Sequence, residues 1–315
     1  MYDKLKMWTD RDIIGELLPS ISTYFDDCKT IVDKSTGEVK EYGSVEGLKV
    51  AVYSGGLSVI GSLAKFHNTD NILPLNRAST SEAIEMLSDR LHVDMKLAKI
   101  TSLEFGTHFL MKEPVPSYID LLGDAPRLKR FRCTENTLYY RSCGKNEYKV
   151  HTFYDKGAEM AKRGGKMPFG LDGANLLRYE LRFNRQLAQQ LKTSEVTGAV
   201  LYDRYFYKSM IDRYCEVYFS ISKTRDLKTN IMSEIKTVSD AFDVMVARLI
   251  NNGNQGEITA FIEELKQSKV FADPKNYSRL KAKIKSIASK VDLTETNELI
   301  NELDNEMKNI GSYGV

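Results

Sequence analysis

Alternating apolar and polar residues recur through the first half of the chain and predict β-strands. Residues 29–43 alternate around a Thr-Gly-Glu turn, a pattern typical of a β-hairpin. Residues 47–66 form two further extended segments joined at a Gly-Gly turn, and residues 97–112 form another strand. Between them, residues 79–95 carry apolar side chains at helical spacing. The expected N-cap of this helix is Ser79, Thr80 or Ser81.

The same alternation of apolar and polar residues continues in the middle of the chain. Residues 130–156 are expected to form a pair of strands joined at residues 142–147. A loop rich in glycine and lysine follows at residues 162–175, and the apolar alternation of residues 176–184 predicts another strand. Residues 185–193 then continue as a short helix.

The last third of the chain is helical in pattern. Residues 239–253, 256–271 and 276–291 each place apolar residues on one side of a helix, with Ser239 as an N-cap and Gly253 at the end of the first. We therefore expect an α+β fold, with an antiparallel or mixed central sheet backed by helices and a helical C-terminal region. The expected division is 1–222 for the α+β domain and 223–315 for the helical region.

Composition excludes several classes of protein. No apolar run reaches the roughly 18 residues of a membrane span, and the charged N-terminal segment does not resemble a secretion signal. The four cysteines are scattered, which argues against structural zinc and disulfides and indicates a reducing cytoplasm. The glycines fit neither a Rossmann nor a P-loop pattern.

Charge is unevenly distributed along the chain. Residues 127–192 contain 15 Lys/Arg against 6 Asp/Glu, a net charge of +9, whereas residues 1–126 have 13 against 19, a net charge of −6. A basic block of this kind indicates a surface that binds a polyanion, although it could also be an ordinary solvated face.

Two predicted strands carry candidate chemical groups on one face. Alternation places Glu104 with Ser102 and His108 on the polar side of residues 97–112. In residues 176–184 it places Glu180 between Arg178 and Arg182. Each glutamate could be a simple ion-pair partner, or a carboxylate ligand for Mg²⁺ or Mn²⁺ beside phosphate-binding arginines.

Tyr154 ends a predicted strand and is followed by charged residues. If a helix begins near Asp155, Lys156 and Glu159 lie one turn apart. A tyrosine hydroxyl has a pKa near 10 and needs a neighbouring cation or metal ion to act as a nucleophile. Tyr154 is accordingly either a packed strand residue or a nucleophile with a cation beside it.

Three blocks of sequence resemble one family of replication proteins. They are ITSLEF, LYYRSCGKNEYKVHTFYDKGAEM and LLRYELRF, which occur in the order that the family shows. Over residues 48–191 the chain resembles the rolling-circle replication initiators of filamentous phages and related plasmids, with their Y-x-K-x-x-E unit followed by an R-x-E-x-R-like strand.

The resemblance implies an enzyme that nicks one DNA strand at a replication origin. The enzyme would stay attached to the 5′ phosphate through tyrosine and leave a 3′ hydroxyl for a polymerase. Carried over by position, Tyr154 would be the nucleophile and Lys156 a phosphate-stabilising cation. Glu104 and Glu180 would bind Mg²⁺ or Mn²⁺, and Glu159 would be a third ligand or base, or a partner of Lys156.

The resemblance also implies DNA as the partner, either single-stranded or as an origin hairpin, in the cytoplasm of a bacterial host. A host helicase, a polymerase and a second copy of the chain are further candidate partners. The chain lacks the His-hydrophobic-His metal motif of many other rolling-circle initiators, and His151 is expected on the face opposite Tyr154. The residues expected to contact DNA are Arg130, Arg132, Arg141, Lys162, Arg163, Lys166, Arg178 and Arg182.

Two alternatives stay open from the sequence. The first concerns the nucleophile, because residues 200–219 contain the tyrosines Tyr202, Tyr205, Tyr207, Tyr214 and Tyr218, at spacings that also suit core packing. The second concerns function. A non-catalytic DNA-binding protein would keep the fold without bringing Glu104 and Glu180 close to Tyr154. Tyr139, Tyr140 and Arg141 are expected to add stacking surfaces for single-stranded DNA.

Overall fold

The computed structural model describes residues 1–142, 147–165, 167–168, 170–228, 231–252, 255–288 and 294–313. Its centre is one ten-stranded sheet in which every pairing is antiparallel. In spatial order the strands are β2 (Asp27–Val32), β3 (Val39–Val45), β4 (Leu48–Tyr53), β5 (Gly56–Ser62), β1 (Tyr2–Asp10), β6 (Lys99–Met111), β10 (Asn175–Phe183), β9 (Lys149–Asp155), β8 (Thr137–Ser142) and β7 (Leu128–Thr134). The α+β prediction is confirmed, with an antiparallel sheet.

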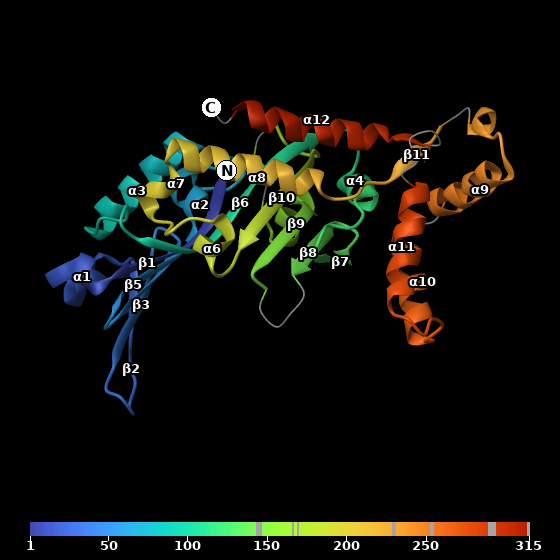
Figure 1. The fold of residues 1–315 in the computed structure, drawn as a ribbon. Coiled ribbons are helices and arrows are strands. Elements are labelled where there is room, and N and C mark those ends of the chain that lie inside the picture. Colours follow the sequence, from blue (N-terminus) through green and yellow to red (C-terminus); the bar gives the residue numbers. More distant parts are fainter. Residues whose placement is uncertain are drawn as a thin grey trace.

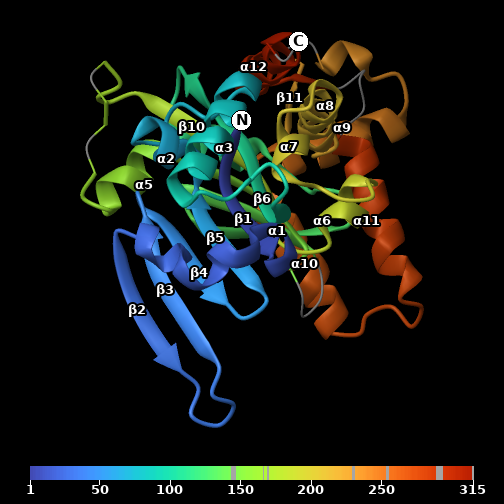
Figure 2. The same cartoon turned by 90° about the vertical axis from the view of Figure 1, so that its left-hand side faces the viewer.

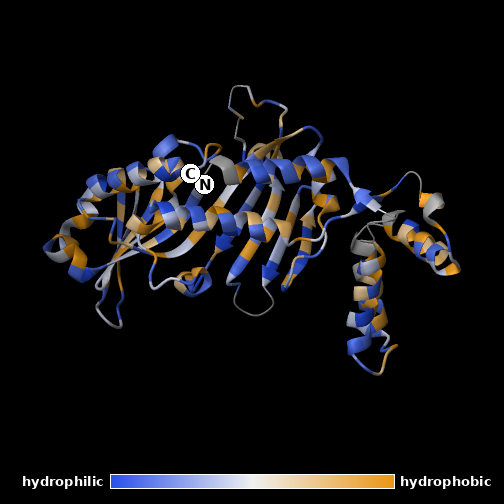
Figure 3. Ribbon diagram, turned by 45° about the horizontal axis from the view of Figure 1, so that its top comes forward, coloured by the Kyte–Doolittle hydropathy of each residue, from blue (hydrophilic) through white to orange (hydrophobic). Residues whose placement is uncertain are grey.

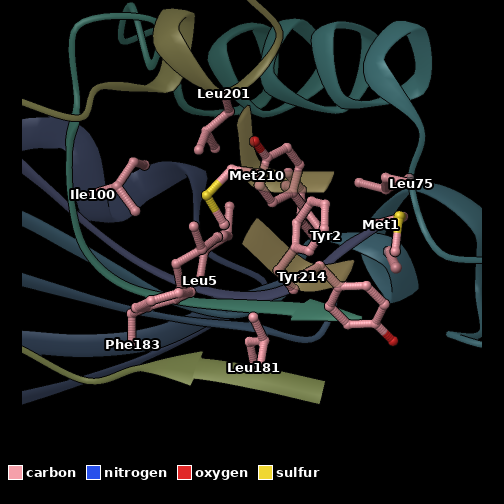
Figure 4. Packing of buried hydrophobic residues seen from close by; sticks show 14 of the residues in the cluster. Met1, Tyr2, Leu5, Leu75, Ile100, Leu181, Phe183, Leu201, Met210 and Tyr214 are labelled. Carbon is pink, nitrogen blue, oxygen red and sulfur yellow. The ribbon is translucent and has the colours of Figure 1, made fainter. Parts of the chain in front are cut away.

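Three long helices pack on one face of this sheet (Figure 1). They are α3 (Arg77–Leu91), α8 (Arg204–Phe219) and α12 (Glu298–Tyr313). The aromatic rings of Phe105 and Tyr179 lie 5.7 and 4.5 Å from the ring of Tyr214 on α8. Figure 4 shows this packing around Tyr2, Leu181 and Tyr214. Because successive side chains of a strand alternate, Glu104, Glu180 and Tyr154 lie on the opposite face, which we call the site face.

Shorter elements connect the strands. The helices are α1 (Arg11–Ile14), α2 (Leu63–Asn68), α4 (Val115–Leu121), α5 (Lys156–Lys162), α6 (Leu187–Leu191) and α7 (Gly198–Leu201), with a 3₁₀ helix η1 (Gly15–Tyr24). The β2–β3 hairpin, which its alternating sequence predicts, extends away from the body of the sheet (Figure 2).

The C-terminal region contains α9 (Val238–Asn252), α10 (Gln255–Gln267) and α11 (Lys275–Ala288), a 3₁₀ helix η2 (Ile231–Glu234), and a two-stranded pairing of β11 (Arg225–Leu227) with β12 (Thr294–Thr296). The last helix, α12, returns to α8 and buries Ile300, Leu303 and Met307 in the main core. Apolar and polar residues alternate along these helices (Figure 3). A domain division near residue 222 stays a prediction, although α12 adds to the core of the first part.

Two local predictions are corrected. Residues 128–155 form three strands rather than a pair, because an additional turn at residues 134–137 joins β7 to β8. Residues 143–146, within the turn expected at 142–147, lie outside the described residues. The cap of α3 is Asn76, whose side chain accepts a hydrogen bond from the Ser79 backbone while Ser79 bonds back to Asn76. This reciprocal pair places the N-cap three residues before Ser79, the earliest expected cap.

Within the described residues, no helix has the length and apolar content needed to cross a bilayer.

Candidate active site

Three carboxylates from adjacent strands meet on the site face. Asp3 comes from β1, Glu104 from β6 and Glu180 from β10, and one oxygen of each lies within 4.8 Å of the others. Gly106 lies directly opposite Glu180 on β6. A Cβ at Gly106 would lie 2.3 Å from the backbone oxygen of Tyr179 and 3.1 Å from Cγ of Glu180, so only glycine leaves room for Glu180 here.

Two arginines neutralise part of this negative charge. Arg178 is completely buried and pairs with both Asp3 and Glu180. Arg182 donates to Oε2 of Glu180 over 2.6 Å, and its Nε lies 3.4 Å from Oε1 of Glu104. Buried charges are stable only when they are paired in this way. The alternation that placed Arg178, Glu180 and Arg182 on one face is confirmed.

The two glutamates differ in protonation. Burial opposes ionisation of Glu180, but Arg178 and Arg182 outweigh it and lower its pKa to about 2. Burial raises the pKa of Glu104 to about 7; Arg182 opposes this rise, and the neighbouring charges of Glu180 and Asp3 add to it. The charge of Glu104 is therefore less compensated by neighbouring positive groups than that of Glu180.

Tyr154 points into this cluster from β9. Its hydroxyl donates a hydrogen bond of 2.9 Å to Oε1 of Glu180, and Arg178 lies directly opposite it on β10. Burial, followed by the negative charge of Glu180, raises the pKa of the phenol well above its usual value near 10. The phenol is thus oriented by an acid and, in the protein alone, is held in its protonated form.

Lys156 and Glu159 lie on the helix that follows Tyr154. Asp155 caps α5 by accepting a hydrogen bond from the Ala158 backbone, which starts the helix at Lys156 as predicted. Nζ of Lys156 lies 2.9 Å from Glu159 and 3.2 Å from Oδ1 of Asn71. Glu159 also pairs with Arg163 over 2.7 Å. Glu159 is thus a partner of two cations and lies outside the carboxylate cluster.

The predicted DNA-binding residues divide between the two faces. Arg178, Arg182 and Arg141 share the site face with Tyr154. Arg130 and Arg132 lie on the other face, because they pair in register with Tyr140 and Leu138 of β8, which are buried in the helix-covered core. These two arginines do not line the site, and any contact they make with DNA would lie elsewhere.

Arg130 and Arg132 also have hydrogen-bond or ion-pair partners within the protein. Arg130 donates to the carbonyl oxygen of Leu122 over 2.9 Å, and Arg132 pairs with Asp120 over 3.1 Å. Lys162 and Arg163 are exposed at the end of α5, beyond Lys156. Lys166 lies outside the described residues.

The tyrosines of residues 200–219 divide in a similar way. Tyr207, Tyr214 and Tyr218 are buried in the main core, which confirms the packing interpretation for these three. Tyr205 is 82% exposed and Tyr202 is partly buried, so neither is held beside the carboxylates by a described contact. Tyr140, expected as a stacking surface, is instead completely buried and donates to the carbonyl oxygen of Gly123.

Sequence reasoning missed Asp3 and Asn71, and it placed His108 on the face of Glu104 without assigning it to the site. Asp3 completes the carboxylate cluster, and Asn71 links Asp3 to Lys156 through hydrogen bonds of 2.9 and 3.2 Å. Nε2 of His108 lies 3.0 Å from the guanidinium of Arg178, which donates to it. Burial and the charges of Arg178 and Lys156 lower the pKa of His108 to about 2, so it is neutral. His151 lies on the opposite face, as predicted.

The sequence signals the strand that carries Asp3, but not the face on which Asp3 lies. Leu5, Met7 and Thr9 alternate with Lys4, Lys6 and Trp8, which predicts a half-buried strand at this end of the chain. Alternation alone would place Asp3 on the apolar face with Leu5 and Met7, and a register shift between Tyr2 and Leu5 accompanies its position with the site residues instead. Asn71 offers no such signal because it lies in the connection between α2 and α3.

The chain is similar to known replication proteins. A profile of the phage CRI family, which describes the N-terminal part of a replication-associated protein, matches residues 23–202. Among solved structures, the chain is similar to a rolling circle replication initiator protein from Geobacillus stearothermophilus, with 14% sequence identity and a TM-score of 0.40. That match covers 73% of this chain and 88% of the other. A comparison with curated proteins gave no match.

The range matched by the family profile contains the five residues expected to carry catalysis or bind metal, which are Glu104, Tyr154, Lys156, Glu159 and Glu180. The range begins after Asp3, the third member of the carboxylate cluster. Because the family match spans more than half of the chain, this protein belongs to the phage CRI family of replication-associated proteins.

Proposed function

We propose that this replication initiator nicks one DNA strand at an origin with Tyr154 as the nucleophile. The product would be a 5′-phosphotyrosine link and a free 3′ hydroxyl that a polymerase can extend. The observation that carries the proposal is the hydrogen bond of 2.9 Å from Tyr154 to Glu180, within a cluster of three carboxylates.

The chemistry requires the phenol oxygen to form a bond to phosphorus while the bond from phosphorus to the 3′ oxygen breaks. The phenol gives up its proton, and the departing 3′ oxygen takes up a proton to become a hydroxyl. Glu180 supports the attack on phosphorus because it accepts a hydrogen bond from the phenol and so fixes the direction of the phenol oxygen's lone pairs. The raised pKa of Tyr154 means that an added cation is needed to favour the phenolate.

Asp3, Glu104 and Glu180 are the residues that would hold Mg²⁺ or Mn²⁺. Their donor set fits such an ion, since hard divalent ions prefer carboxylate oxygens and these three approach within 4.8 Å. Glu104 fits best, because Arg182 is its ion-pair partner at the long distance of 3.4 Å and because burial, followed by the negative charges of Glu180 and Asp3, raises its pKa. A bound ion would lower the pKa of the phenol and offset charge on the phosphate.

Positive side chains complete the proposed site. Lys156 is 4% exposed and is held by Glu159 and Asn71 next to the carboxylates. Its ammonium group would offset negative charge that develops on the phosphate during transfer. In this account Glu159 positions Lys156 and does not bind the metal. Arg141, Lys162 and Arg163 would contact the DNA backbone farther from the phosphorus atom.

The rival interpretation is a DNA-binding protein without catalysis. It expects Glu104 and Glu180 to lie apart from Tyr154, whereas the structure brings Glu180 into contact with Tyr154 and Glu104 close to Glu180. This proximity supports the catalytic proposal over the rival.

A cleavage assay tests the proposal. The protein is incubated with a supercoiled plasmid that carries the replicon's own origin, with Mg²⁺ or Mn²⁺, and relaxed open circles are measured. The expected result is nicking by the unaltered protein, none with a chelator, and none by Tyr154→Phe, which still binds the DNA. Nicking by Tyr154→Phe at the unaltered rate would overturn the assignment of the nucleophile.

A further inference from the structure

A cluster of two aromatic rings and one arginine lies at the β7 edge of the ten-stranded sheet. Phe131 is on β7, and Tyr139 and Arg141 are on β8. The guanidinium carbon of Arg141 lies 4.7 Å from the centre of the Tyr139 ring and 5.6 Å from that of Phe131. Phe131 is 48% exposed and Tyr139, directly opposite it, is partly buried. The cluster therefore presents an apolar ring beside a planar cation to solvent.

This cluster shares the site face with Tyr154 and Glu180. Phe131 pairs with Tyr139, Tyr139 with Thr152, and Thr152 with Glu180, so their side chains form one row across four strands. Neighbouring strands are about 4.8 Å apart, which places Tyr139 roughly 10 Å from Glu180 along this row. A strand bound at Tyr154 could reach the cluster within a few nucleotides.

The charge of this region suits a polyanion. The cluster lies in the segment 127–192, whose net charge is +9, and exposed Lys129 lies directly opposite Arg141. Arg141 pairs with Glu147 over 3.2 Å, and both side chains are more than 40% exposed. Exposed ion pairs are weak, so a DNA phosphate can replace Glu147 at little cost.

We propose that Phe131, Tyr139 and Arg141 form a base-stacking subsite for single-stranded DNA on one side of the cleaved phosphate. The inference deepens the proposed function and rests on it for the position of the phosphate. Aromatic rings and arginine planes stack on unpaired bases of any identity, whereas duplex DNA does not offer a free base face. The subsite would therefore select an unpaired strand without reading its sequence.

The test separates base stacking from phosphate binding. Binding is measured by fluorescence anisotropy on the Tyr154→Phe protein, so that no covalent product forms. One probe is a single-stranded oligothymidylate, and the other is an oligomer of equal length and charge with abasic sugars. We expect the parent protein to bind the oligothymidylate roughly tenfold more tightly, the effect of stacking one base.

Three variants give the decisive comparison. Phe131→Ala and Arg141→Lys should each lose most of the preference for the oligothymidylate and keep their affinity for the abasic oligomer. For Arg141→Lys, the affinity for the abasic oligomer should stay within a factor of about two of the parent value, because lysine keeps the positive charge. Phe242→Ala is the matched control, since Phe242 on α9 is 53% exposed and lies outside the cluster. An unchanged preference in Phe131→Ala and Arg141→Lys, or equal binding of the two oligomers by the parent, would overturn the subsite.

The outcome is independent of the nicking chemistry. If the stacking preference is present but no cleavage occurs in the plasmid assay, the subsite stands and the proposed function fails. If cleavage occurs and the preference is absent, the proposed function stands and the subsite fails.

Discussion

Tyr154 and Glu180 lie on neighbouring antiparallel strands, and the hydroxyl of Tyr154 donates a 2.9 Å hydrogen bond to Oε1 of Glu180. Glu180 is 2% exposed and also accepts hydrogen bonds from Arg178 and Arg182. One carboxylate thus orients the candidate nucleophile and balances two arginines. The site is therefore coupled to the stability of the centre of the sheet.

Loss of the Glu180 charge should destabilise the protein strongly. In Glu180→Gln, Arg178 stays completely buried with only Asp3 to balance it, and removing one partner of a buried ion pair costs about 3–5 kcal/mol. The free energy of unfolding in urea measures this. Asp212→Asn is the control, because Asp212 pairs with Lys208 on the exposed surface and should cost less than about 1 kcal/mol. A Glu180→Gln variant as stable as the control would contradict the account.

Glu104 should make stability depend on pH when no divalent ion is present. Its pKa is about 7 in the folded protein and near 4.5 in the unfolded chain, so the folded state binds the proton more tightly. Stability contributed by this protonation is complete below about pH 4.5 and falls as pH rises to about 7. The difference in unfolding free energy between the unaltered protein and Glu104→Gln, followed across this range, should show that fall. A difference that does not change with pH would show that Glu104 titrates normally.

Divalent ions should stabilise the protein more at high pH. A metal ion competes with the proton on Glu104, so Mn²⁺ should raise the melting temperature more at pH 8 than at pH 6. Asp3→Asn should reduce the shift at pH 8, because it removes one carboxylate of the cluster. The control is Asp33→Asn, a change in the β2–β3 turn away from the cluster. Equal shifts in Asp3→Asn and the unaltered protein would exclude Asp3 as a ligand.

The last helix should contribute to the stability of the sheet domain. Leu303 of α12 is completely buried in the main core, and Tyr218 of α8 donates a 2.7 Å hydrogen bond to Asp304. Leu303→Ala should cost about 2–5 kcal/mol of unfolding free energy, whereas exposed Lys308→Ala should change it by less than about 0.5 kcal/mol. A chain ending at residue 222 should likewise be less stable than the whole. Equal melting temperatures for the shortened and whole chains would show that α12 is dispensable.

Much of the site could be predicted because strand alternation is a local property. The period of two in residues 176–184 and 148–155 placed Glu180, Arg178 and Tyr154 on the faces where the structure has them. Alternation also separates Arg130 and Arg132 from Phe131. Which of these faces meets the helices, however, depends on pairing between β7, β8 and β9, and so on contacts distant in sequence.

The residues that were missed depend on such distant contacts. Asp3 reaches the cluster because β1 pairs with both β5 and β6 in the middle of the sheet. The buried state of Arg178 depends on Asp3 and on the backbone oxygen of Asn71, which no local pattern connects to β10. The polar face predicted from strand alternation is therefore a buried network of charged residues in the structure.

Mapping of the covalent adduct tests the central claim most directly. The protein is incubated with single-stranded origin DNA and Mn²⁺, digested, and the peptide that carries a nucleotide is identified by mass spectrometry. The account predicts an adduct on the peptide containing Tyr154 and none with Tyr154→Phe. An adduct on a peptide containing Tyr202 or Tyr205, or an adduct that persists in Tyr154→Phe, would contradict it.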